Sequence, residues 1–175
     1  LAFHLNEGQQ RVFLCVAEAL RAVHGGARLE PPLRVRLIGA PGVGKSLAIR
    51  AILWYAQQLG FARNQLAVAA PTARAAICLL TGSSLCRTAH GLFSIAVPPS
   101  DKALSEPQLQ RLQEVFAPLA LIVLDETCMF GQEMFYRMHQ RTCMGRQQND
   151  SEVPFADVPI VLCAGDHYQH AAVAG

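Results

Sequence analysis

The spacing of apolar positions predicts one long amphipathic helix and several buried strands. Residues 6–24 carry apolar side chains three to four positions apart, which is the spacing of one helix face. Gly25 and Gly26 then favour the end of that helix. Further along, nearly continuous apolar runs predict strands that are covered on both faces. These runs are residues 33–40, 65–72, 119–126 and 158–166.

Helix-like segments separate the predicted strands. The clearest are residues 46–59 and 107–117, and a shorter one covers residues 73–80. Strands that alternate with helices predict an α/β fold with a mainly parallel sheet. Ligands of such sheets bind at the carboxyl ends of the strands, where the predicted strands end in polar or glycine-rich sequence. Residues 97–108 and 143–154 are predicted to be exposed loops.

Composition narrows the class of protein. Of the 175 residues, 51% are hydrophobic and 16% are charged, which suits a single globular domain. No apolar run is long enough for a membrane span, so no membrane partner is expected. Six cysteines without paired spacing favour buried, reduced thiols in an intracellular protein over disulfides or a zinc site. Because the chain begins at Leu1, we interpret it as a piece of a longer protein.

The distribution of charge is more informative than the net charge of +2. Residues 51–100 contain three arginines and no acidic residue. A segment without acids is compatible with a phosphate-backbone partner such as a nucleic acid. A segment that is mostly buried also lacks acids, for purely structural reasons. Charge alone leaves both interpretations open.

The stretch GAPGVGKS matches the pattern G-x-x-x-x-G-K-S of a phosphate-binding loop. Its glycines allow backbone N–H groups to curl around a phosphate chain, and the following helix directs its positive end at the same phosphates. Lys45 is expected to neutralise the β- and γ-phosphates of ATP, and Ser46 to give its hydroxyl to Mg²⁺. The alternative is an ordinary glycine-rich turn capped by Ser46. The candidate nucleotide-binding residues are Gly39, Ala40, Pro41, Gly42, Val43, Gly44, Lys45 and Ser46.

Two adjacent acids end the third predicted strand. Asp125 is a candidate to hold Mg²⁺, mostly through water, and Glu126 to orient and deprotonate an attacking water. The alternative is an acid pair at the start of a helix, since residues 127–140 look helical. The phosphate-binding loop about eighty residues earlier favours the catalytic interpretation.

At this point the sequence resembles a known family. The segments GAPGVGKS, PTARAAICLLTGSSLCRTAHGLF, LIVLDETCMF and PFADVPIVLCAGDHYQ follow one another as in the nucleotide-binding half of Pif-type DNA helicases, with RecD-type helicases as cousins. The similarity covers about residues 5–170. The first segment is shared by many NTPases, whereas the second and fourth are much more specific. The resemblance implies a RecA-like P-loop NTPase lobe, with a mainly parallel sheet and helices on both faces.

The resemblance also implies residues that face DNA. Thr72 corresponds to a threonine that contacts the backbone of single-stranded DNA, and Arg74 and His90 lie in the same DNA-facing segments. Each has a structural alternative. Thr72 is well placed to cap a helix at 73–80, and His90 is equally well explained as a histidine of the core.

A glutamine near the end of the chain has an implied catalytic role. Gln169, in GDHYQ, corresponds to a glutamine that senses the γ-phosphate and couples it to DNA, with Asp166 anchoring the loop. An amide can donate to a phosphate oxygen and accept from water at once. The structural alternative is an ordinary polar turn after the strand. The chain departs from the family here, because HAAVAG follows Gln169 where leucine and prolines are usual. It also has Ala156 and Asp157 where glycines are common.

The segment LNEGQQRVF resembles the short motif whose glutamine reads the adenine edge, and the spacing points to Gln9. The structural alternative is a capping box, in which Asn6 and Gln9 begin the first helix together. The two interpretations stand equal.

The sequence therefore predicts one RecA-like ATP-binding lobe over residues 1–175, with ATP and Mg²⁺ as cofactors and single-stranded DNA as partner. The resemblance implies a helicase that moves from 5′ to 3′ and serves repair, recombination and telomere or genome maintenance. A second lobe is expected in the parent chain, and a nuclear or mitochondrial location if the source is eukaryotic. The alternatives are a P-loop ATPase that does not act on DNA and a weakly catalytic nucleotide-binding module from a decayed mobile-element helicase.

Overall fold

The computed structural model describes residues 3–79, 82, 84–98, 102–148 and 151–166, with the side chain of Cys78 excluded. Five parallel strands form one sheet, in the order β1-β5-β4-β2-β3. Their bounds are β1 Leu33–Ile38, β2 Leu66–Ala70, β3 Leu85–Thr88, β4 Leu121–Leu124 and β5 Ile160–Gly165. The predicted α/β class and the parallel sheet are confirmed.

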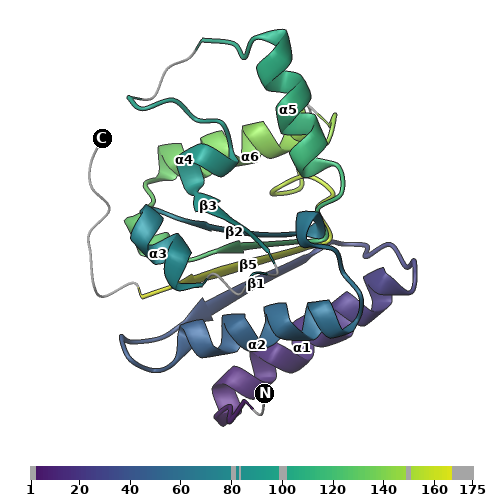
Figure 1. Cartoon of the computed structure of the whole chain (residues 1–175), viewed down its shortest axis with the longest axis vertical. Coiled ribbons are helices and arrows are strands. Elements are labelled where there is room, and N and C mark those ends of the chain that lie inside the picture. Colours follow the sequence, from purple (N-terminus) through teal and green to yellow (C-terminus); the bar gives the residue numbers. More distant parts are fainter. Residues whose placement is uncertain (1–2, 80–81, 83, 99–101, 149–150, 167–175) are drawn as a thin grey trace.

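Helices cover both faces of the sheet (Figure 1). On one face lie α1 and α2, on the other α4, α5 and α6, and α3 packs against β2 and β3. The bounds are α1 Glu7–His24, α2 Lys45–Gln58, α3 Ala73–Cys78, α4 Ala89–Leu92, α5 Glu106–Phe116 and α6 Gln132–Gly145. Short 3₁₀ turns, η1 Arg63–Gln65 and η2 Thr127–Met129, precede β2 and follow β4. Among the described helices, none is both long and apolar enough to cross a membrane.

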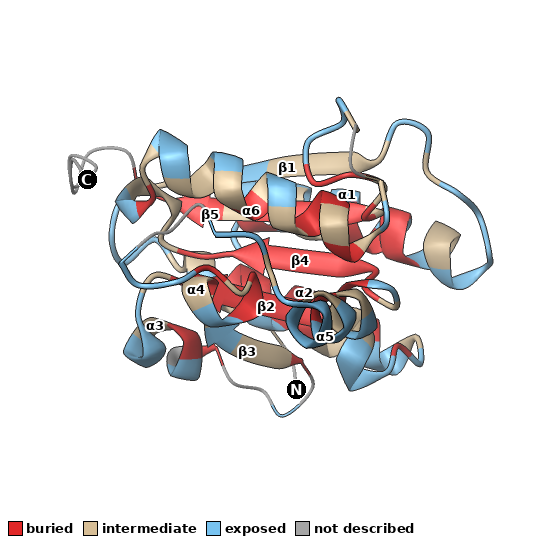
Figure 2. Cartoon of the chain, turned by 90° about the horizontal axis from the view of Figure 1, so that it is seen from above, coloured by how far each residue is buried: buried red, intermediate tan, exposed pale blue. Residues whose placement is uncertain are grey.

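The core is divided into two layers by the sheet. Successive side chains of a strand point to opposite faces. In β2, Leu66 and Val68 therefore pack with α1 and α2, whereas Ala67 and Ala69 pack with α4, α5 and α6. All residues of β2 and β4 are buried, and the edge strands β1 and β3 are more exposed (Figure 2). This explains why the central strands read as continuous apolar runs.

Several predicted boundaries are wrong. The sequence missed β3, because this strand has four residues of mixed polarity at the edge of the sheet. The predicted loop 97–108 ends at Ser105, whose capping box with Gln108 begins α5. The second predicted loop begins only after α6 ends at Gly145. The helix predicted directly after Glu126 is a 3₁₀ turn, and α6 begins at Gln132.

The prediction of buried thiols holds only in part. Cys143 is buried, Cys15 is exposed on α1, and Cys86, Cys128 and Cys163 are half-buried. All five are free thiols, among the cysteines whose side chains the structure describes. Val16 beside Cys15 is buried, whereas Leu14 is exposed, so the apolar residues around Cys15 in the sequence did not reveal that it points outward.

Ala156 and Asp157, which replace the glycines that are common in the family, lie before β5, at the sheet edge opposite the phosphate-binding loop. Phe155 and Ala156 have φ values of 59° and 51°, in the left-handed region that favours glycine. The Arg34 guanidinium holds this turn by donating to the carbonyls of Pro154, Ala156 and Val158, at 2.8, 2.9 and 2.8 Å. The departure is therefore stabilised locally and does not contact the loop after β1.

Candidate nucleotide-binding site

The phosphate-binding loop leaves the carboxyl end of β1 and enters α2. Gly42 and Gly44 have φ values of 75° and 81°, which residues with a Cβ adopt only at a cost. Gly44 is the N-cap of α2, and no side chain caps this helix. The alternative of a turn capped by Ser46 is therefore wrong, because Ser46 lies inside the first turn and is exposed. An uncapped helix N-terminus after a glycine-rich loop is the arrangement that binds phosphate.

Lys45 folds back over the loop that precedes it. Its Nζ atom donates to the carbonyl oxygens of Gly39 and Ala40, at 2.6 and 3.0 Å. Gly39 is required for this compact shape, because an added Cβ would lie 2.8 Å from a methyl group of Val43. The ammonium group is thus placed at the mouth of the loop, where phosphate oxygens would meet it.

Asp125 lies at the carboxyl end of β4, on the same edge of the sheet. It is buried, and its backbone N–H donates to Ala69 O at 2.9 Å. Burial raises the pKa of its carboxyl group, and the neighbouring Glu126 carboxylate raises it further. A hydrogen bond from the Glu126 backbone and the charge of Lys45 oppose this rise in pKa. Because β5 lies between β1 and β4, the loop after β1 and Asp125 flank the carboxyl end of the same strand.

Glu126 begins the turn that follows Asp125. Its φ of 52° and ψ of 42° place it in the left-handed region, which is uncommon for a residue with a side chain. The helix-dipole alternative for the acid pair is wrong, because α6 begins six positions after Glu126. The left-handed residue instead leads the chain from β4 into η2, and Glu126 is half-buried there.

Contacts through β5 join the loop after β1 to the acids after β4. The N–H of Gly39 donates to Gly165 O at 3.3 Å, and Thr127 Oγ1 donates to Ala164 O at 3.0 Å. A Cβ on Gly165 would lie 2.6 Å from Thr127 Oγ1, so only glycine fits there. Sequence reasoning missed Thr127 and Gly165. A glycine at the end of a buried strand was the available signal, since it often marks a close approach of backbone.

Gln9 connects the first helix to the loop. Its Oε1 accepts from the Asn6 N–H at 2.9 Å, and Asn6 Oδ1 accepts from the Gln9 N–H at 3.0 Å. The capping-box interpretation is therefore confirmed. In addition, Gln9 Nε2 donates to the carbonyls of Val43 and Gly44, at 2.8 and 3.2 Å. No sequence pattern indicated this contact, and adenine recognition by Gln9 stays a prediction.

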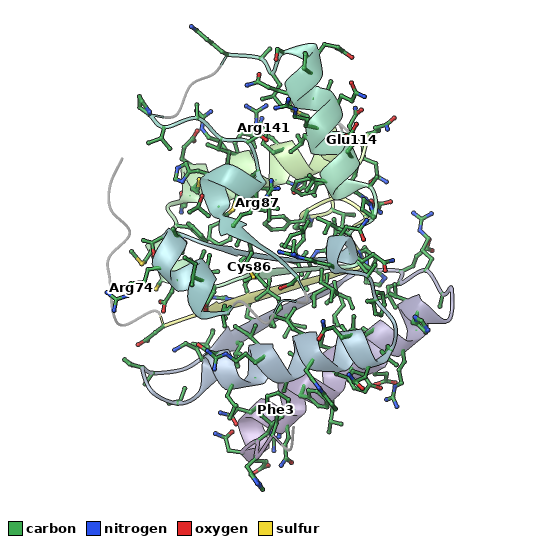
Figure 3. All side chains as sticks on the ribbon, viewed as in Figure 1. Phe3, Arg74, Cys86, Arg87, Glu114 and Arg141 are labelled. Atoms are coloured by element: carbon green, nitrogen blue, oxygen red, sulfur yellow. The ribbon has the colours of Figure 1, made fainter. Side chains whose placement is uncertain are left out.

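The residues assigned to DNA lie at the same edge of the sheet, beyond β4. Thr72 caps α3, because its Oγ1 accepts from the Ala75 N–H at 3.2 Å. Arg74 is exposed on α3 (Figure 3). His90 is half-exposed on α4 and lines a surface cavity, so its interpretation as a core histidine is wrong. Gln169 lies outside the described residues, whereas its neighbour Asp166 is buried at the end of β5.

These features define a class of protein: a RecA-like lobe with a phosphate-binding loop at one sheet edge and a buried acid across β5 from it. The chain belongs to the AAA-domain family, whose model matches residues 27–174. A comparison with curated protein sequences gave no match.

The chain is also similar to solved structures of Pif1 helicases. Bacteroides Pif1 bound to ssDNA matches with a TM-score of 0.66 and 20% identity, over 100% of this chain and 34% of that one. Bacteroides Pif1 in complex with ADP-AlF3 and ssDNA matches with a TM-score of 0.68 and 20% identity, over 99% of this chain and 35% of that one. Pif1 from Candida albicans matches with a TM-score of 0.65 and 21% identity, over 99% of this chain and 35% of that one. These matches show that the fold is that of the RecA-like lobe in Pif1 structures. The chain spans about a third of the length of those proteins.

Proposed function

We propose that the chain is the ATP-binding lobe of a helicase-type ATPase that moves along single-stranded DNA from 5′ to 3′. The observation that carries this proposal is the convergence of Lys45, Asp125 and Glu126 at one edge of the sheet. The residues assigned to DNA occupy the neighbouring strand ends of that edge. The similarity to helicases solved with ssDNA and with a nucleotide analogue supports both ATP binding and DNA binding in the proposal.

The site fits Mg²⁺ with ATP by the chemistry of its donors. An exposed hydroxyl at Ser46 and a buried carboxylate at Asp125 are oxygen ligands, which this cation prefers. When bound, Mg²⁺ would neutralise charge on the phosphates. Lys45 would exchange its two loop carbonyls for phosphate oxygens, and Glu126 would orient and deprotonate the attacking water. Gln169 would sense the γ-phosphate.

A second lobe in the parent protein would complete the reaction. In related NTPases an arginine from a second element stabilises the transferred phosphoryl group and contributes about three to five powers of ten in rate. We therefore expect residues 1–175 to bind Mg-ATP, to hydrolyse it slowly and not to unwind DNA. The parent protein would act in DNA repair, recombination and telomere maintenance, in the nucleus or mitochondrion if its source is eukaryotic.

The test of this function is the ATPase rate of the parent protein with and without single-stranded DNA. Strong stimulation by DNA, lost on Thr72→Ala with Arg74→Ala but retained in Arg21→Ala, would support a DNA motor. Arg21 is a suitable control because it is exposed on α1, away from the proposed track. Turnover that is indifferent to DNA would leave a P-loop ATPase without a DNA substrate. Nucleotide binding without any turnover would point to a decayed binding module.

Gln9 gives a prediction about the nucleotide base. Both amide protons of Gln9 are used by loop carbonyls, and an amide has only two such protons. The Gln9→Ala variant is therefore expected to lose about tenfold in affinity for ADP and for GDP alike, through a looser loop, since two hydrogen bonds contribute about 1–2 kcal/mol. Equilibrium binding of fluorescent ADP and GDP measures this, with the exposed Gln10→Ala as the control. A loss confined to the adenine nucleotide would instead support base recognition by Gln9.

A further inference from the structure

A basic cavity lies on the face covered by α4, α5 and α6. Its volume is about 560 Å³, and polar groups from four separate segments line it. They are His90 on α4, Ser94 just after α4, Lys102 before α5, Gln108 and Arg111 on α5, and Arg141 on α6. No acidic side chain is among the described residues that line it. The cavity therefore has the character of an anion site.

Two arginines of this cavity have no carboxylate partner among the described residues. Arg111 is exposed and has no ion pair there, and the Arg141 guanidinium donates only to the thioether of Met144, at 3.5 Å. Elsewhere in the structure an arginine close to the core does have a carboxylate partner: Arg146 pairs with Asp157 at 2.6 Å. Burial lowers the pKa of Arg141, and the charge of Arg137 lowers it further. An anion in the cavity would relieve this repulsion.

The cavity continues the edge to which DNA is assigned. Strands β2 and β3 are parallel neighbours, and Ala70 is in register with Thr88. The segments that follow them, with Thr72 on one and His90 on the other, therefore leave the sheet side by side. His90 also lines the cavity together with Arg141. Figure 3 labels Arg74 on α3, Arg87 on β3 and Arg141 on α6, one above another in this view.

We propose that this cavity binds the phosphodiester backbone of single-stranded DNA, as a second contact beyond Thr72 and Arg74. The inference rests on the proposed DNA function. Guanidinium groups bind phosphate oxygens through two parallel hydrogen bonds, and the hydroxyl of Ser94 and the amide of Gln108 supply further donors. The two arginines come from different helices, which suits successive phosphates of a chain better than one small anion.

The test compares oligothymidylates of two lengths, of about 4 and about 12 nucleotides. Fluorescence anisotropy on the 175-residue chain measures their binding by the double variant Arg111→Ala/Arg141→Ala. We expect the longer oligonucleotide to bind about tenfold more weakly and the shorter one to be unaffected. The slope of log affinity against log salt should fall by about 1.4, because two phosphate contacts are lost at ~0.7 each for a single strand. The matched control is Arg21→Ala/Arg28→Ala, two exposed arginines at the α1 side.

The outcomes separate this inference from the proposed function. If Thr72→Ala/Arg74→Ala weakens both oligonucleotides while the Arg111/Arg141 variant binds like the unaltered chain, the cavity assignment is overturned and the function stands. If the unaltered chain binds ADP but no oligonucleotide, both are overturned. A loss of ADP or free tripolyphosphate affinity in the double variant would show a small-anion site instead. Since Arg141 is half-buried, thermal melting accompanies the binding assay, and the exposed Arg111→Ala alone carries the test if the double variant is unfolded.

Discussion

The Lys45→Ala variant is expected to bind ATP about 100-fold more weakly than the unaltered chain, because it loses charge-assisted hydrogen bonds worth roughly 3 kcal/mol. The effect has two sources in the structure. The ammonium group that would contact the β- and γ-phosphates is removed. The two bonds from Nζ to Gly39 O and Ala40 O, which hold the loop in its compact shape, are removed with it.

Equilibrium titration with a fluorescent ATP analogue checks this prediction on the 175-residue chain. Arg21→Ala is the control, since Arg21 is an exposed cation in the last turn of α1, away from the phosphate-binding loop. Thermal melting of both variants should show that the fold is retained, because Lys45 is only half-buried. An unchanged affinity in Lys45→Ala would show that the loop does not hold the phosphates.

The phosphate-binding loop could be predicted because its pattern is local. A strand, a glycine-rich turn and a helix start follow within a few residues, and each has its own sequence signal. The central strands could be predicted for a similar reason, since a strand that is buried on both faces has a continuous apolar sequence. The edge strand β3 was missed because half of its surface is solvent-facing and Arg87 interrupts its four residues.

Contacts between distant segments could not be predicted in this way. Gln9 reaches carbonyls 34 and 35 positions further along the chain, and nothing near Gln9 in the sequence indicates them. The cavity between α4, α5 and α6 likewise joins His90 to Arg141 only through the tertiary fold. The late start of α6 has a local cause that propensity alone does not show. Phe130 is buried, and Gly131 then takes the extended N-cap conformation, so the chain turns before it becomes helical.

The Glu126→Gln variant is expected to slow ATP hydrolysis by at least about 100-fold, because general-base catalysis contributes about 10²–10⁴ in rate. Affinity for Mg-ATP should not fall. Glutamine has the same shape as glutamate, so the left-handed turn at this position is kept. Loss of the Glu126 charge also removes an influence that raises the pKa of Asp125, so Asp125 stays ionised, and able to hold Mg²⁺, down to a lower pH.

The measurement is the rate of hydrolysis by the parent protein with single-stranded DNA, together with ATP affinity between mildly acidic and neutral pH. Glu114→Gln, an exposed substitution of the same kind on α5, is the control and should leave both quantities unchanged. We expect the acidic limb of the affinity profile to move to lower pH in Glu126→Gln, because a lower pKa of Asp125 keeps its carboxylate able to hold Mg²⁺ at more acidic pH. Normal turnover in Glu126→Gln would exclude Glu126 as the base. Slow turnover with an unchanged dependence of ATP affinity on pH would support Glu126 as the base. It would also show that the charge of Glu126 does not influence the pKa of Asp125.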